Sequence, residues 1–439
     1  MAARLVPTAE RPLLGDTRLK MLEALEEDSL FEMSFFLRSE MMRCLEKDTN
    51  LTLHRTRQAL AQDNANGSPM VKLLHAIPRK LTSSLVMGTL AYDYHPLQHN
   101  EKYPDDGAGA YAVAPYIEGR DGKFLNNKET QSLIDDLEFY IDAYHANARH
   151  QNNDQLMDVR DRRLQNFSNA VDKVSKDNWT PRDGVKLRWI QGKSTCNAIV
   201  AFREALVNRV KASPDATGDV YHEQAPIYVG CSDKMDGRMP HHSPKSTLSD
   251  TGIGLGLLLS ILKYREISVD VVAIPVVWAW EDEMLPLSEV LVTLLAQSLA
   301  DQGGLNVVEP GTQKDVRAAA SAQAARRHEE LEVVAGRFPF LKENADATNK
   351  AIEQYEALVV EMEALRVDCQ PGNLQSAQAL VDDVRSLKTL EKELDQMIIT
   401  LEELLKKADE ENKLLLQQYD AICDANEQLA QWQAYYSRM

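Results

Sequence analysis

The chain has 439 residues, of which 44% are apolar, and a formal net charge of -18 at pH 7. This much apolar material excludes a disordered chain, and the length allows two or three domains. The acidic surplus argues against a protein that coats nucleic acid, because such a surface needs Lys and Arg in excess. Only the segment 151–245 carries a slight basic surplus.

Neither a secretory signal nor a membrane span is expected. The first residues, MAARLVPTAERPLLGD, are interrupted by charges and two prolines. The apolar runs GIGLGLLLSIL and VDVVAIPVVWAW are too short to cross a bilayer, which takes roughly 20 residues. We therefore expect an intracellular protein, nuclear or cytoplasmic, without a membrane partner. The five cysteines form no C-x-x-C pair and predict neither a zinc site nor a disulfide framework: Cys44, Cys196, Cys231, Cys369 and Cys423.

Residues 1–180 are predicted to form a helical region. Apolar residues recur at helical spacing in MLEALEEDSLFEMSFFLRSEMMRCLEK. A polar loop with Pro104 and several glycines follows, and helices resume near Glu129 with ETQSLIDDLEFYIDAYHANARH.

The pattern changes over residues 181–311, where strands alternate with helices. VKLRWI alternates apolar and basic residues, which predicts a half-buried first strand. Helix CNAIVAFREALVNRVKAS, strand PIYVG, helix SDTGIGLGLLLSILKY, strand SVDVVAIPVVWAW and helix PLSEVLVTLLAQSLADQGG follow in that order. This alternation predicts one small α/β domain, so that the whole chain is expected to be an α+β multidomain protein.

Residues 312–439 are predicted to be helical to the end. An apolar seam recurs there at spacings of three and four: Leu387, Leu390, Leu394, Met397, Leu401 and Leu404. About three heptads do not fix how many helices pack together. A coiled coil between two copies and a helical hairpin within one chain therefore both remain open. Self-association or a protein partner would use this seam, whose acidic flanks suit nucleic acid poorly.

The strand PIYVG is followed at fixed distances by basic residues. Arg238 stands ten residues after Tyr228, and His242 stands four residues after Arg238. Downstream, Glu289 lies near the start of a predicted helix and Asn306 lies behind that helix, in an "LN…PG" context. This order of residues resembles the GIY-YIG nucleases, a family with a small α/β domain that cleaves phosphodiester bonds in nucleic acid.

The resemblance implies a catalytic site and a metal cofactor. Arg238 would bind phosphate oxygens with its planar, permanently charged fork. Tyr228 and His242 would position or deprotonate the attacking water, and Asn306 would orient the site. Glu289 would hold Mg²⁺ or Mn²⁺ as a single carboxylate ligand. The implied function is metal-dependent cleavage of DNA or RNA.

The first motif of the family is missing from the expected place. No GIY tripeptide precedes YVG, and Trp189 is the only large aromatic residue of the predicted first strand. Tyr221 lies too close to Tyr228 to leave room for a hairpin. Two alternatives therefore stay open: a catalytically inactive GIY-YIG-like domain within a protein-binding scaffold, or a helical scaffold with an unrelated α/β insert.

Overall fold

The computed structural model describes residues 7–11, 15–26, 30, 33–34, 36–37, 69–95, 107–151, 158–174, 187–279, 284–308, 310, 339–368 and 406. The chain divides into two units, Met1–Ile352 and Glu353–Met439. The sheet and the whole candidate site belong to the first unit. Within these described ranges, no helix combines the length and the apolar character that crossing a membrane requires.

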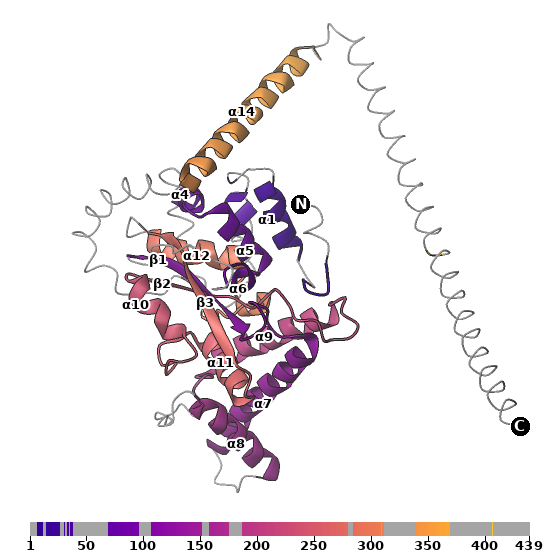
Figure 1. Cartoon of the computed structure of the whole chain (residues 1–439), viewed down its shortest axis with the longest axis vertical. Coiled ribbons are helices and arrows are strands. Elements are labelled where there is room, and N and C mark those ends of the chain that lie inside the picture. Colours follow the sequence, from indigo (N-terminus) through magenta and orange to yellow (C-terminus); the bar gives the residue numbers. More distant parts are fainter. Residues whose placement is uncertain are drawn as a thin grey trace, which may run out of the picture. The chain divides into compact units, whose positions relative to one another are not determined.

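A three-stranded antiparallel sheet with the strand order β2-β1-β3 forms the centre of the first unit (Figure 1). The strands are β1 (Gly109–Ile117), β2 (Tyr228–Ser232) and β3 (Val269–Trp278). β1 lies in the middle and pairs with both neighbours. The protein therefore mixes helices with a small antiparallel sheet, which confirms the α+β class at this coarse level.

Helices cover both faces of the sheet because successive residues of β1 point to opposite sides. Ala110 and Ala112 belong to one apolar core, and Tyr111 and Val113 belong to the other. The first core is completed by α1 (Asp16–Glu26), α4 (Pro69–His75), α5 (Arg79–Met87), α6 (Leu90–Asp93) and α12 (Met284–Ala296). The second is completed by α7 (Asn127–Gln151), α8 (Val159–Lys173), α9 (Lys193–Lys211) and α11 (Ile253–Tyr264).

The predicted first strand is wrong. Leu187–Ile190, the described part of VKLRWI, form no strand. The backbone N–H of Arg188 bonds to the Asp172 carboxylate, and its guanidinium bonds to the carbonyls of Asp172 and Thr247. The alternation that resembled a half-buried strand thus reflects an arginine that is anchored inward among polar groups.

The central strand of the sheet comes instead from β1, inside the region that was predicted to be helical. The sheet is therefore not contained in residues 181–311, and the expected boundary at residue 180 cuts through it. α7, α8 and α9 fill the long interval between β1 and β2. The other elements predicted for the α/β region are present as α9, β2, α11, β3 and α12, with the short helices α10 (Met235–Arg238), η2 (Met239–His242) and η3 (Ala300–Gln302).

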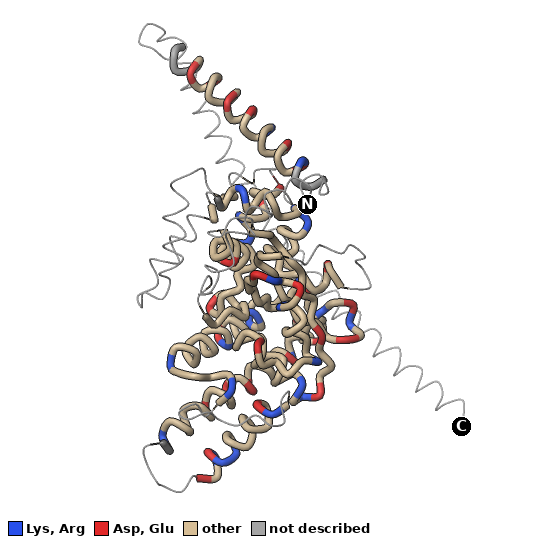
Figure 2. Tube along the Cα trace, turned by 90° about the vertical axis from the view of Figure 1, so that its left-hand side faces the viewer, with Lys and Arg blue, Asp and Glu red and all other residues tan. Residues whose placement is uncertain are grey.

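Helix α14 (Pro339–Asp368) represents the predicted C-terminal helical region among the described residues. Its first turns dock on α4, where the Asn344 amide donates to the carbonyls of His75 and Ile77. Acidic residues outnumber basic ones along α14 (Figure 2). The predicted leucine seam, Leu387 to Leu404, lies outside the described residues.

Candidate functional site

A buried tyrosine of β1 lies across the neighbouring strand. Tyr111 pairs with Gly230 of β2 in the antiparallel register. A Cβ at position 230 would lie 2.6 Å from the Tyr111 hydroxyl oxygen. The glycine of YVG thus leaves the space through which the Tyr111 phenol passes over β2, an outer strand of the sheet.

The Tyr111 hydroxyl meets a buried histidine. Its oxygen lies 2.9 Å from Nε2 of His242, the last residue of η2. Burial, then the positive charge of Arg238 and that of His241, lower the pKa of His242 to about 3. His242 is therefore neutral at pH 7, and a neutral imidazole has one acceptor nitrogen that can receive the phenol O–H.

Tyr228, the tyrosine of YVG, packs against the same histidine. The ring centroids of Tyr228 and His242 are 5.1 Å apart. A Cβ at Gly252, which precedes α11, would lie 2.2 Å from the Tyr228 ring. A second glycine therefore makes room for a second phenol. Burial is the main reason why the pKa of both Tyr111 and Tyr228 lies above its usual value.

Arg238 supplies a positive charge to the cluster that Tyr111, Tyr228 and His242 form. It ends α10 and is half-buried. Burial raises the pKa values of Tyr111 and Tyr228, and the charge of Arg238 partly offsets this rise. The same charge helps burial to lower the pKa of His242. Arg238 therefore lies within electrostatic range of all three aromatic side chains.

Glu289 reaches this group from α12, which packs on the opposite face of the sheet from Tyr111. The thiol of Cys231 donates to Oε2 of Glu289 over 3.1 Å. The Glu289 charge helps to raise the pKa of Cys231, Tyr111 and Tyr228, after the larger effect of burial. Glu289 and Arg238 therefore act on the same groups, and the carboxylate joins the cluster at the edge of β2.

Asn306 holds that edge strand in place. Its side-chain amide accepts from the N–H of Val229 over 2.8 Å and donates to the carbonyl of Val229 over 2.7 Å. The amide thus pairs both outward backbone groups of Val229, as a neighbouring strand would. Asn306 orients β2 and with it Tyr228, but it reaches the cluster only through the backbone.

The five side chains predicted from the sequence are therefore brought to one part of the sheet, and their roles remain predictions. The sequence did not single out Tyr111, which the structure brings against His242. A signal was present, because Gly109, Ala110 and Tyr111 read GAY ahead of an apolar run. Tyr111 and His242 are 131 positions apart in the chain, and no local pattern relates them.

Glu289 brings a carboxylate to the cluster and is the metal ligand that the sequence predicts. Across the described ranges, no three side chains of His, Cys, Asp or Glu are grouped so that they could hold a metal ion. Glu289 offers one hard oxygen ligand set, which suits Mg²⁺ or Mn²⁺ with most of their waters retained. The Cys231 thiol is a poor additional ligand, because burial and Glu289 raise its pKa well above its usual value. That Glu289 holds such an ion stays a prediction.

Comparison with protein-family models, with curated proteins and with solved structures finds no match to this chain.

Proposed function

We propose that this chain hydrolyses phosphodiester bonds of DNA or RNA through a GIY-YIG-like domain built around β1, β2 and β3. One observation carries the proposal. Five side chains of complementary chemistry, drawn from β1, β2, α10, η2 and α12, gather at the edge of β2: Tyr111, Tyr228, Arg238, His242 and Glu289.

The first-strand tripeptide supports the family assignment. GAY at Gly109–Tyr111 differs from the GIY motif only in its middle residue. It pairs antiparallel with YVG, so that Tyr111 faces Gly230. The main reason to expect an inactive domain was the lack of a first tyrosine, and Tyr111 supplies that phenol.

Arg238 would bind two oxygens of the scissile phosphate and offset the negative charge that grows on them in the transition state. Tyr111 would accept a proton from the attacking water while its own phenol proton passes to Nε2 of His242. The water oxygen then bonds to phosphorus, the bond to the leaving ester oxygen breaks, and that oxygen takes a proton from solvent.

Bound phosphate would also assist the proton transfer. After burial, the positive charge of Arg238 is the next cause of the low pKa of His242. A phosphate that neutralises Arg238 raises that pKa and makes the imidazole a better proton acceptor. Glu289 would hold the Mg²⁺ or Mn²⁺ ion. When bound, the ion would stabilise charge on the leaving oxygen.

Binding of nucleic acid without cleavage is the second candidate function. The thiol of Cys231 occupies Oε2 of Glu289, so that one carboxylate oxygen is already engaged by the protein. If this arrangement excludes the metal ion, Arg238 still offers a phosphate contact. The domain would then bind a polynucleotide and leave it intact.

Incubation of the purified full chain with single-stranded, duplex and branched DNA and RNA, with Mn²⁺ or with a chelator, separates these functions. We expect metal-dependent cleavage that Tyr111→Phe lowers by about a hundredfold, since one proton-transfer group typically contributes roughly 10²–10⁴. Tyr116→Phe is the matched control, because Tyr116 lies on the same strand but in the opposite core. Binding of any of these substrates without cleavage would support the second function. The absence of both binding and cleavage would contradict both functions.

A further inference from the structure

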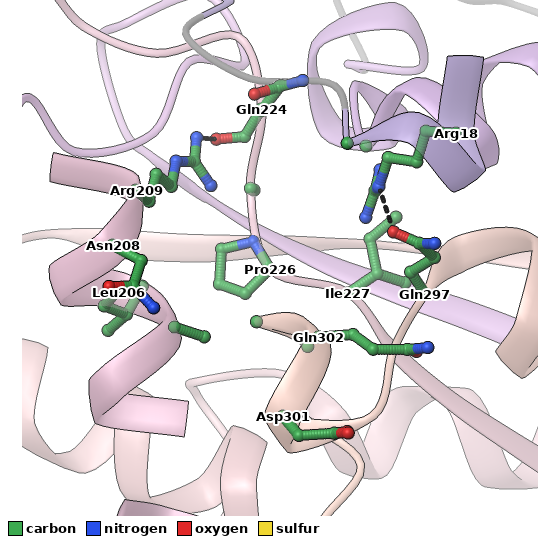
Figure 3. Close-up of a pocket in the computed structure, with 16 residues that line it drawn as sticks. Arg18, Leu206, Asn208, Arg209, Gln224, Pro226, Ile227, Gln297, Asp301 and Gln302 are labelled. Carbon is green, nitrogen blue, oxygen red and sulfur yellow. Dashed lines mark hydrogen bonds between the residues drawn. The ribbon is translucent and has the colours of Figure 1, made fainter. Parts of the chain in front are cut away.

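A second polar site lies apart from the catalytic cluster, in a pocket between α1, α9 and the segment that follows α12 (Figure 3). Its volume is about 300 Å³. Two arginines, Arg18 of α1 and Arg209 of α9, line it from different sides. None of the residues that form the catalytic cluster lines this pocket.

Arg18 is held at the C-terminal ends of two helices. Its guanidinium donates to the carbonyls of Val86, near the end of α5, and of Ala296, at the end of α12. Its Nε donates to the side chain of Gln297 over 3.0 Å. The partial negative charge of helix C-termini stabilises a cation at this position, but three acceptors without a formal charge leave the positive charge of Arg18 in place.

Arg209 retains hydrogen-bonding capacity. Its Nη2 donates to the carbonyl of Gln224 over 2.8 Å and lies 3.4 Å from Nδ1 of His222. Its Nε is buried and has no hydrogen-bond partner among the residues that the structure describes. A buried donor without a partner costs free energy, and a ligand oxygen that reached it would recover that cost.

The part of the chain that the structure describes offers the two charges no carboxylate partner. Among the described residues, neither Arg18 nor Arg209 takes part in an ion pair with Asp or Glu. Burial lowers the pKa of both to about 10, and for Arg209 the charge of Arg18 adds to this. Both stay protonated at pH 7. Asp301 also lines the pocket but lies away from both guanidinium groups in Figure 3.

We propose that this pocket binds a phosphate group, as carried by a nucleotide or by the phosphorylated end of a polynucleotide. Guanidinium groups on different sides suit an anion with several oxygens in a tetrahedral arrangement, and paired N–H donors match phosphate geometry. Ligand sites of roughly 300–1,000 Å³ hold small molecules, so the pocket has room for more than the phosphate alone. The site is independent of the proposed hydrolysis.

Thermal unfolding and calorimetry of the purified full chain test the site with four probes. These are inorganic phosphate, adenosine 5′-monophosphate, and one short oligonucleotide with and without a 5′-phosphate. Chloride at matched ionic strength controls for screening. We expect phosphate to raise the melting temperature where chloride does not. Tighter binding of the mononucleotide, or of the 5′-phosphorylated oligonucleotide over its unphosphorylated form, identifies the source of the group.

Arg209→Gln should lower phosphate affinity at least tenfold. The matched control is Arg203→Gln, on the same helix, whose side chain forms an ion pair with Glu138 outside the pocket. Retained affinity in the Arg209 variant, or the same loss in the control, would overturn the site.

Asp301→Asn provides a test that survives if the Arg209 variant fails to fold. Asp301 is exposed, and its substitution removes a negative charge from the pocket wall. We expect phosphate to bind about threefold more tightly, because like charge opposes the anion. Unchanged or weaker binding by this variant contradicts the assignment.

Discussion

The proposed catalytic cluster and the pocket region each combine a half-buried arginine with a buried histidine. Burial and the arginine lower the pKa of His242 in the cluster and of His222 beside the pocket, in both cases to about 3. The surroundings differ. His242 meets the Tyr111 phenol, whereas His222 lies against Arg209, and the charge of Asp215 only partly offsets the lowering of the His222 pKa. We propose that the first arrangement moves a proton and that the second binds an anion.

The largest effect is expected from the charges of the cluster. Arg238→Ala and Glu289→Ala should each lower cleavage by at least about a hundredfold, the loss typical of removing one transition-state contact. Melting temperature should change little, since both side chains are only half-buried. Turnover and thermal unfolding measured side by side check this prediction. Arg203→Gln is the control for loss of a positive charge. If the variants lose much stability and lose activity in proportion, Arg238 and Glu289 have a structural role.

The buried histidine beside the pocket should make folding sensitive to acid. The folded pKa of His222, about 3, lies below the ordinary value of 6.5. Its contribution to stability is therefore complete above pH 6.5 and is lost as the pH falls from 6.5 toward 3. We expect the free energy of unfolding, measured by denaturant titration, to fall between pH 7 and pH 4. In His222→Gln this fall should be smaller by on the order of a few kcal/mol.

The histidine prediction has a control on the molecular surface. His145→Gln replaces an exposed histidine and controls for the loss of a histidine as such. Identical slopes for His222→Gln and the unmodified chain would show that His222 does not titrate on unfolding. The comparison of the two arginine–histidine pairs would then fail.

A smaller effect on stability is expected from the glycine beneath Tyr111. Gly230→Ala adds a Cβ 2.6 Å from the phenol oxygen, so the ring must move away from His242. Overpacking of this kind costs roughly 1–3 kcal/mol. Unfolding and cleavage assays of the same preparation give the measurement. Gly237→Ala is the matched control, because a Cβ there meets no atom within 4 Å. Full activity in the Gly230 variant would remove Tyr111 from the mechanism.

Local sequence determined the elements that are continuous in the chain. Helices α9, α11 and α12 and strands β2 and β3 follow from the period of their apolar residues, which depends on near neighbours alone. The spacing of Tyr228, Arg238 and His242 is likewise local, since one strand and two short helical turns connect them. A fixed number of residues in a known backbone geometry spans a fixed distance, so these side chains lie close together, and their roles stay predictions.

Tertiary structure alone decided that Tyr111 lies beside Tyr228 and His242, and that Arg18 lies near Arg209. β1 is buried along its whole length, so it lacks the polar alternation that marks a half-buried strand. Leu187–Ile190 show that alternation without forming a strand, because the Asp172 carboxylate and backbone carbonyls satisfy Arg188. Strand pairing joins Tyr111 to Gly230, and helix packing brings Arg18 near Arg209. Burial and pairing energies depend on residues far apart in the chain, and no local pattern encodes them.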